Sequence, residues 1–372
     1  MEPEMKEVTY RHAVLEGTSY ECGRQLGEQI REGAPWEHAM YAELRDGQKD
    51  IPDEKLAALL SDNDRYCPGI NDELRGLADG MGIPLKRLAS TILWKHETGG
   101  CSHIVALPAA TIDGHVLAAR SYEWSLDDAL RLVTTRVTGH YAHIGFSIMG
   151  AGRFDGLNEK GLCVTMSAGA PGLQPDASGF MFWVGMRAAL DRCATVEEAL
   201  PVLTAPPSCT CDIIIVSDRG GNAALIENDC GHRAVKRVGP GSSERWLYAT
   251  NHYTLPGMAG HGNKPMWMST ARSLKISEVL ATTPAISIDT LRGLLSAPVP
   301  EGLCCHYYNE WFGTLWSMLF DVTEGAVEVC FGSPAANAWH KFGLDDPQGL
   351  REYTVSLPIE KCTDPKFFAR EA

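Results

Sequence analysis

Residues 99–124 read GGCSHIVALPAATIDGHVLAARSYEW, and the character of the sequence changes here. Upstream of this segment apolar residues recur at helical spacing, whereas downstream short apolar runs are separated by turn residues. Asp113-Gly114 is a strong turn signal, and it predicts a hairpin that pairs residues 101–107 with residues 115–121. The segment therefore marks the boundary between a helical part of the chain and a part rich in antiparallel strands.

The first 100 residues are predicted to be mainly helical. A short strand is expected near Val8–Leu15, and Thr18 with Glu21 forms a capping-box pattern at the start of a helix. Pro35 marks the break after that helix. Further helices are expected near Glu54–Leu60, Asn71–Met81 and Pro84–Trp94.

Residues 101–372 are predicted to alternate hairpins with helical regions. Three more hairpins are expected, pairing 132–139 with 142–149, 212–217 with 223–227, and 314–321 with 326–331, beside helical regions at 182–203 and 270–296. This alternation indicates the α+β class, with two antiparallel sheets and helices outside them. Because the sequence has no repeat and no long linker, we expect one domain over 1–372, with 1–100 as a helical segment docked on 101–372.

The composition excludes several classes of function. The chain has 372 residues, 44% of them hydrophobic and 22% charged, and a net charge of −14, with an isoelectric point near 5.3. This acidity argues against nucleic acids and anionic membranes as partners. No apolar run approaches the roughly 20 residues that a membrane helix needs, and no signal peptide is recognised. We therefore expect a cytoplasmic protein whose 12 cysteines are mostly free thiols.

The common cofactor and metal motifs are missing from the sequence. There is no Walker A pattern, no C-x-x-C pair, no H-E-x-x-H and no G-x-S-x-G elbow. We expect neither a cofactor nor a metal. One alternative stays open, a zinc-stabilised structural protein that uses Cys209, Cys211, Cys304 and His306, although their spacing does not match common zinc sites.

Cys101 is the one cysteine that the pattern singles out. It follows two glycines, which tolerate strained backbone conformations, and it lies at the start of a predicted strand. A thiol in this position could attack the carbonyl group that precedes it. By pattern alone, the alternative of a packing cysteine remains open.

The surrounding motifs resemble a known family. Cys101, the following hairpin and the segment Ala119-Arg120-Ser121-Tyr122-Glu123-Trp124 look like the Cys-type N-terminal nucleophile (Ntn) hydrolases. The closer resemblance is to peptidase family C45, the acyl-coenzyme A:6-aminopenicillanate acyltransferase family. Other segments match that family in the same order: Gly-Arg-Gln-x-Gly at 23–27, the Pro-to-Gly segment at 68–80, Asn-Glu-Lys-Gly-Leu at 158–162, Asn251-His252 and Cys305-His306.

The resemblance implies an Ntn-hydrolase αββα sandwich that matures by cutting its own chain. The cut would fall between Gly100 and Cys101, so that the precursor is a zymogen and the fragments 1–100 and 101–372 stay associated. Cys101 would then supply both the nucleophilic thiol and, through its new α-amine with a pKa of about 8, the general base.

The same resemblance assigns roles to other residues. Arg120 would favour the thiolate of Cys101, and Asn251 would donate to the developing oxyanion. Glu123 stands where the family usually has Asp, and a carboxylate there would hold the α-ammonium group. Ser167 and Arg272 are supporting candidates, the first near a position where relatives often carry Asn, the second like a distal arginine of the bile-salt-hydrolase branch.

The implied reaction is acyl transfer from a small-molecule linear amide, through a Cys101 thioester, to water or an amine. The departures at Glu123 and Ser167 keep a second hypothesis open, an uncleaved and catalytically weak binding protein on the same fold. His252 and His306 are expected to be structural, and the aromatic run 306–312 could wall an acyl pocket or pack as a core loop. Homo-oligomer formation is also left open.

Overall fold

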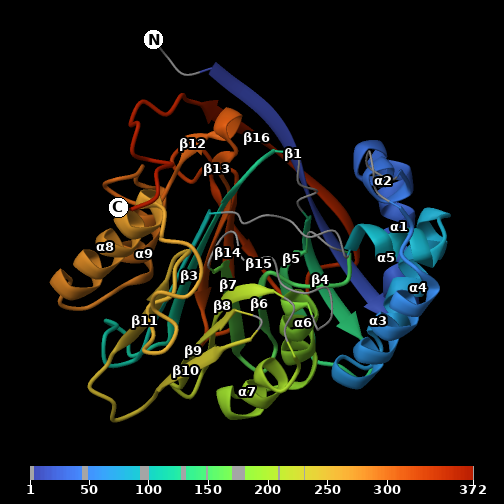
Figure 1. The fold of residues 1–372 in the computed structure, drawn as a ribbon, viewed down its shortest axis with the longest axis horizontal. Helices are drawn as coiled ribbons and strands as arrows, with labels where there is room; N and C mark the ends of the chain where they lie inside the picture. Colours follow the sequence, from blue (N-terminus) through green and yellow to red (C-terminus); the bar gives the residue numbers. More distant parts are fainter. Residues whose placement is uncertain are drawn as a thin grey trace.

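Two β-sheets are stacked face to face, and helices cover both outer faces (Figure 1). Contacts between β2 and β7 and between β11 and β9 join the inner faces of the two sheets. The expected α+β class and αββα layering are thereby confirmed. The computed structural model describes residues 4–43, 49–92, 100–126, 131–147, 150–169, 181–207, 210–229 and 231–371.

The larger sheet has nine strands in the order β10-β9-β8-β7-β6-β5-β4-β1-β16. Its strands are β1 (Glu4–Gly17), β4 (Arg131–Val137), β5 (His143–Ser147), β6 (Asp155–Asn158), β7 (Leu162–Ala168), β8 (Cys211–Asp218), β9 (Ala223–Asp229), β10 (Arg233–Val238) and β16 (Gly349–Ile359). The expectation of purely antiparallel sheets is wrong at one place, because β1 pairs with β4 in parallel. A parallel pair needs a long connection, and here the N-terminal helices and the β2–β3 hairpin supply it.

The smaller sheet carries the predicted hairpin of residues 101–121 at its centre. The order is β11-β2-β3-β13-β14-β15, and β12 also pairs with β13. Its strands are β2 (Gly100–Ala106), β3 (Leu117–Trp124), β11 (Trp246–Ala249), β12 (His306–Tyr307), β13 (Phe312–Asp321), β14 (Ala326–Phe331) and β15 (Trp339–Phe342). Every residue of β2 is buried. The four predicted hairpins are all confirmed, as β2–β3, β4–β5, β8–β9 and β13–β14.

The helices fall into two groups. One group covers the nine-stranded sheet: α1 (Ser19–Gly33), α2 (Pro35–Ala42), α3 (Asp53–Tyr66), α4 (Ile70–Met81), α5 (Leu85–Ile92), α6 (Phe182–Arg192) and α7 (Val196–Thr204). The other group, α8 (Trp267–Thr282) and α9 (Ile288–Ser296), lies on the seven-stranded sheet, and η1 (Tyr308–Glu310) is a short 3-10 turn. The predicted capping box of Thr18 and Glu21 begins α1. Within the described ranges, no helix is both long enough and apolar enough to cross a bilayer.

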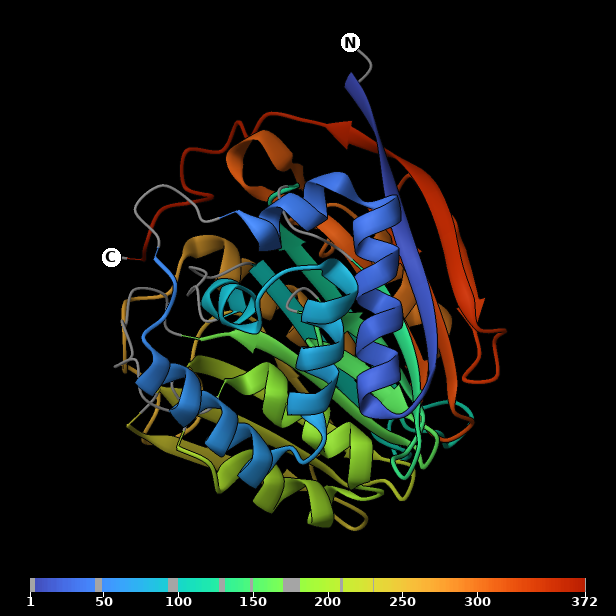
Figure 2. The same ribbon diagram turned by 90° about the vertical axis from the view of Figure 1, so that its right-hand side faces the viewer.

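Helices α1 and α4 lie side by side (Figure 2) and touch along a line of glycines. A Cβ atom on Gly23 or Gly27 of α1 would overlap the backbone of α4 at Glu73 or Leu77. The reverse holds for α4, whose residue Gly76 faces the backbone of α1. These glycines therefore let two helix backbones come into direct contact, which gives the two glycine-containing N-terminal motifs a packing role.

Candidate active site

The candidate residues of the β2–β3 hairpin lie on two opposite faces of one sheet. Directly opposed residues share a face, so Cys101 lies with Tyr122, and His103 with Arg120, between the two sheets. Glu123 belongs to the opposite face, toward α8. Alternation along each strand thus separates the thiol from the carboxylate, although both belong to the same hairpin.

Two residues from distant parts of the chain hold the backbone of Cys101. The backbone N–H of Cys101 donates to Asn251 Oδ1 at 2.9 Å, and its carbonyl accepts from Arg272 Nη1 at 2.6 Å. Arg272 Nη2 also donates to Asn251 Oδ1 at 2.8 Å. Cys101 is only 2% exposed and Arg272 is completely buried. The backbone of Cys101 is therefore held from both sides by groups that are themselves fixed.

The thiol of Cys101 faces the guanidinium group of Arg120. Burial raises the pKa of the thiol above its ordinary value, while the charge of Arg120 and a hydrogen bond from it act in the opposite direction. Arg120 is fixed in turn by Asp155 on β6, with Nε 3.2 Å from Oδ2. In this arrangement a fully buried cation beside the sulfur is oriented by a carboxylate of the opposite sheet.

Glu123 is completely buried on the other face of β3. It accepts hydrogen bonds from Ser121 Oγ and Thr314 Oγ1, and its Oε2 lies 3.5 Å from Arg272 Nη1. Burial raises its pKa to about 7, against the opposing charge of Arg272 and the hydrogen bond from Ser121. Because Arg272 contacts both the carboxylate and the Cys101 carbonyl, Glu123 reaches the nucleophile only through Arg272 or through the backbone.

Asn251 contacts Cys101, whereas Ser167 contacts its neighbours Thr250 and His103. Asn251 turns its oxygen toward Cys101, while its Nδ2 donates to the carbonyl of Ala168 at 3.0 Å. Ser167 donates to the carbonyl of Thr250 and lies 3.2 Å from His103 Nε2. Ser167 therefore contacts His103, which lies on the same face of β2 as Cys101, and not Cys101 itself.

Gly100 is required by packing rather than by an unusual backbone angle. A Cβ atom on Gly100 would overlap the ring of Phe312 and come within 3.1 Å of the Glu123 Cβ. Phe312 is buried and also lies under the guanidinium of Arg272, whose Cζ is 5.5 Å from the ring centroid. The aromatic run 306–312 thus contributes a packing residue behind the Gly100–Cys101 bond, whereas Trp311 is 59% exposed.

Sequence reasoning missed His103, Tyr122, Asp155 and Trp316. His103 is fully buried, its Nδ1 lies 2.9 Å from Thr165 Oγ1, and burial lowers its pKa well below the usual value. Tyr122 stacks on Trp316 with 3.9 Å between ring centroids. His103 could have been found, because it follows Cys101 by two residues on a strand and so shares its face.

His252, His306 and Cys304 take structural positions. His252 lies 2.8 Å from Ser269 Oγ, and burial lowers its pKa, whereas His306 lies 2.7 Å from Ser333 Oγ. Cys304 Sγ is 3.4 Å from His306 Nε2.

The two groupings in the described residues whose ligand atoms could hold a metal include neither Cys304 nor Cys211, and Cys209 lies outside those residues. The described part of the chain therefore gives no support to the zinc alternative. Apart from Cys211, the nine other cysteines of the described ranges form no disulfide.

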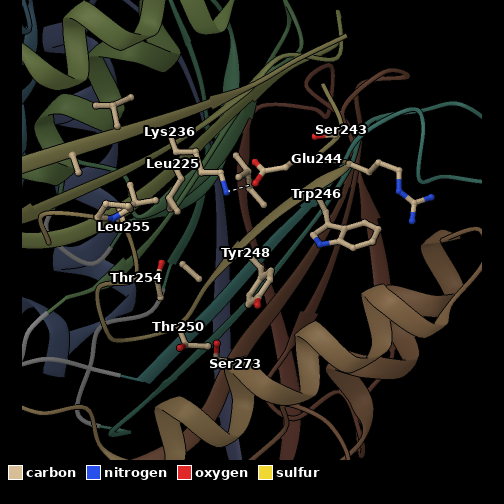
Figure 3. A pocket seen from close by; sticks show the side chains of 16 residues that line it. Leu225, Lys236, Ser243, Glu244, Trp246, Tyr248, Thr250, Thr254, Leu255 and Ser273 are labelled. Carbon is tan, nitrogen blue, oxygen red and sulfur yellow. Dashed lines mark ion pairs between the residues drawn. The ribbon is translucent and has the colours of Figure 1, made fainter. Parts of the chain in front are cut away.

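A cavity of about 940 Å³ lies beside this cluster, between β10, β11 and α8 (Figure 3). Trp246 and Tyr248 of β11 project toward it, and the ion pair of Lys236 with Glu244, 2.6 Å between Nζ and Oε1, closes one end. Thr250, the residue before Asn251, lines the other end. Since Cys101 does not line this cavity, the cavity is a neighbour of the candidate site.

Comparisons with known proteins give one family. The model of the acyl-coenzyme A:6-aminopenicillanic acid acyl-transferase family matches residues 119–336. No curated protein matches the chain. Among solved structures, penicillin V acylase from Agrobacterium tumefaciens is 17% identical with a TM-score of 0.47. The match covers 68% of this chain and 90% of the acylase chain. The Caenorhabditis elegans ortholog of N-acylethanolamine-hydrolyzing acid amidase is 16% identical with a TM-score of 0.44. The match covers 60% of this chain and 93% of the ortholog. A mutant of conjugated bile acid hydrolase from Clostridium perfringens is 14% identical with a TM-score of 0.44. The match covers 68% of this chain and 96% of the hydrolase chain.

Proposed function

Because the chain belongs to the acyl-coenzyme A:6-aminopenicillanic acid acyl-transferase family, we propose that it is a Cys-type Ntn amidohydrolase or acyltransferase. It matures, in this proposal, by cutting its own chain between Gly100 and Cys101. One observation carries the proposal: Arg120, Asn251 and Arg272, each identified from the sequence, all contact or face Cys101.

Maturation begins with attack of the Cys101 sulfur on the Gly100 carbonyl carbon. A C–S bond forms, the Gly100–Cys101 C–N bond breaks, and the nitrogen takes up the thiol proton to become a free α-amine. Water then hydrolyses the thioester, which leaves a carboxylate on Gly100 and restores the thiol. The products are the fragments 1–100 and 101–372 of one folded domain.

In the mature protein the α-amine of Cys101 takes the thiol proton, and the thiolate attacks the substrate amide carbonyl. The leaving amine departs with that proton, and the acyl group remains on sulfur as a thioester. Transfer of the acyl group to water or to an amine completes the cycle. Arg120 lowers the energetic cost of the thiolate by its fixed positive charge.

Asn251 holds the new amine in place, and Arg272 fixes Asn251 and the Cys101 carbonyl. The nitrogen that donates to Asn251 Oδ1 is the one that becomes the α-amine, so this contact fits a positioning role after the cut. The role of oxyanion donor requires Nδ2 to turn away from the Ala168 carbonyl. Glu123 supports amine positioning and oxyanion donation indirectly, by its contact with Arg272. Ser167 helps to position His103, which lies on the same strand face as Cys101.

The substrate class is a small-molecule linear amide, with hydrolysis favoured over transfer. The cavity next to Asn251 has the size of a small-ligand site and combines aromatic walls with one ion pair. It would take the part of the substrate remote from the amide. A panel of acyl amides of increasing chain length, assayed by product release, tests this assignment.

Intact-mass measurement of the purified protein tests maturation. We expect fragments 1–100 and 101–372 from the wild type, and an uncut chain from Cys101→Ala. Cys163→Ala is a matched control, because Cys163 is an equally buried thiol on β7, outside the β2–β3 hairpin, and this variant should still be cut. A wild type that stays a single chain of 372 residues would remove the maturation proposal and favour the alternative, an uncleaved binding protein.

A further inference from the structure

Three side chains with metal-binding atoms converge at the end of β9, away from Cys101. Asp229 is the last residue of β9, His232 precedes β10, and His261 lies on the loop between β11 and α8. Asp229 Oδ2 is 2.7 Å from His261 Nδ1, and Oδ1 is 3.2 Å from His232 Nδ1. The three ligand atoms all lie within 4.8 Å of one another, and the two imidazole rings are in edge contact.

The geometry of this group suits a small divalent ion. Bonds of 2.0–2.1 Å in a tetrahedral site place ligand atoms about 3.3 Å apart, a spacing that lies inside the 4.8 Å within which the three ligand atoms are found here. Two imidazole nitrogens and one carboxylate form a donor set that zinc and its neighbours in the first transition row accept. His232 is 65% exposed and His261 is 33% exposed, so the remaining coordination positions face solvent.

Asp229 is already held in place by hydrogen bonds. Its side chain is only 4% exposed, and its Oδ1 accepts from the backbone N–H groups of Gly231 and His232. Hydrogen bonds of this kind orient a ligand before the metal arrives.

We propose that Asp229, His232 and His261 bind a divalent transition-metal ion such as Zn²⁺, which clamps the β9–β10 hairpin to the loop that follows β11. That loop begins at Thr250-Asn251 and leads into α8, which carries Arg272. Both Asn251 and Arg272 hold the backbone of Cys101. The bound ion therefore stabilises the segment between two residues of the candidate active site, without taking part in the acyl chemistry.

Titration of the full-length protein with Co²⁺ tests this site, because its absorption bands report the ligand types. We expect d–d bands without thiolate-to-cobalt charge transfer, a higher thermal unfolding midpoint, and slower amide exchange in residues 250–266. His261→Ala should weaken Co²⁺ binding by more than the about 10–100-fold that loss of an outer-sphere partner causes. His232→Ala, at an exposed position, should do the same while keeping the apo unfolding midpoint.

His115→Ala is the matched control. His115 belongs to the other metal-compatible group of the described residues, with Asp113 and Asp321, and its loss should leave Co²⁺ binding unchanged. A thiolate charge-transfer band, binding that persists in the His232→Ala/His261→Ala double variant, or binding lost in His115→Ala would overturn the proposal. None of these readouts depends on cleavage at Gly100, so the metal site and the proposed function fail separately.

Discussion

The thiol of Cys101 and the carboxyl group of Glu123 lie on opposite faces of one sheet. Cys101 faces Arg120 between the sheets, whereas Glu123 faces Arg272 beneath α8. Arg272 joins the two sides, because it contacts both Glu123 and the carbonyl of Cys101. Glu123 is therefore coupled directly to Arg272, and to the backbone of Cys101 through Arg272.

The buried carboxyl group of Glu123 predicts a stability that falls as pH rises. Its pKa is raised from 4.5 to about 7 in the folded chain, so the folded state binds the proton more tightly than the unfolded state does. The stability contribution is complete below about pH 4.5 and is lost as pH approaches 7, by at most about 3 kcal/mol. In Glu123→Gln this group no longer titrates.

Urea unfolding of the wild type and of Glu123→Gln, across that pH window, measures the effect. We expect the difference in unfolding free energy between the two proteins to change between about pH 4.5 and pH 7 and to level off above it. A difference that is constant over the whole range would show that Glu123 keeps an ordinary affinity for its proton.

At the scale of elements, the α1–α4 contact depends on the absence of side chains. A Cβ atom on Gly76 would overlap the carbonyl oxygen of Tyr20 and come within 2.8 Å of the Arg24 nitrogen, so the helices would have to separate. We expect Gly76→Ala to lower the unfolding free energy by about 1–3 kcal/mol, the range for overpacked sites. Gly33→Ala in α1 is the matched control.

The nearest atom to a Cβ on Gly33 is 4.0 Å away, so alanine fits there and reduces the entropy of the unfolded chain. We expect Gly33→Ala to be neutral or stabilising by about 0.4–1 kcal/mol. Thermal and urea unfolding of Gly76→Ala and Gly33→Ala measure the change in unfolding free energy that each substitution causes. Equal effects of the two substitutions would mean that helix propensity, and not backbone contact, sets the cost.

Local signals account for the elements that could be predicted. Turn residues such as Asp113-Gly114 and Glu324-Gly325 specify hairpins by themselves, and the capping box at Thr18 specifies where α1 begins. The parallel pairing of β1 with β4 and its antiparallel pairing with β16 join residues far apart in sequence, and no local pattern indicates them. For the same reason Cys101 and Arg120 could be placed from one hairpin, whereas Asp155 on the opposite sheet could not. The group of Asp229, His232 and His261 also forms only through the tertiary fold.

At the scale of the whole molecule, residues 1–100 are built into the rest of the chain. β1 lies between β4 and β16, with pairing from Glu4 to Val14 on one side and from Arg11 to Gly17 on the other. Two buried ion pairs add to this attachment, Glu37 with Arg131 and Glu73 with Arg187. The described residues of this N-terminal segment are thus part of the fold, and we expect that a cut after Gly100 does not release the segment.

We therefore expect the fragments 1–100 and 101–372 of the matured protein to co-elute in native size-exclusion chromatography and to separate only in denaturant. Glu73→Gln should lower the unfolding free energy by about 1–3 kcal/mol, because Arg187 loses one buried ionic partner but keeps Asp191. Asp72→Asn is the control, since Asp72 lies on the same helix but pairs with Arg75 in solvent, and it should change the unfolding free energy little. A fragment 1–100 that elutes alone from the native wild type would contradict this view of the N-terminal segment. It would also mean that β1 is held by the intact peptide bond rather than by its pairing with β4 and β16.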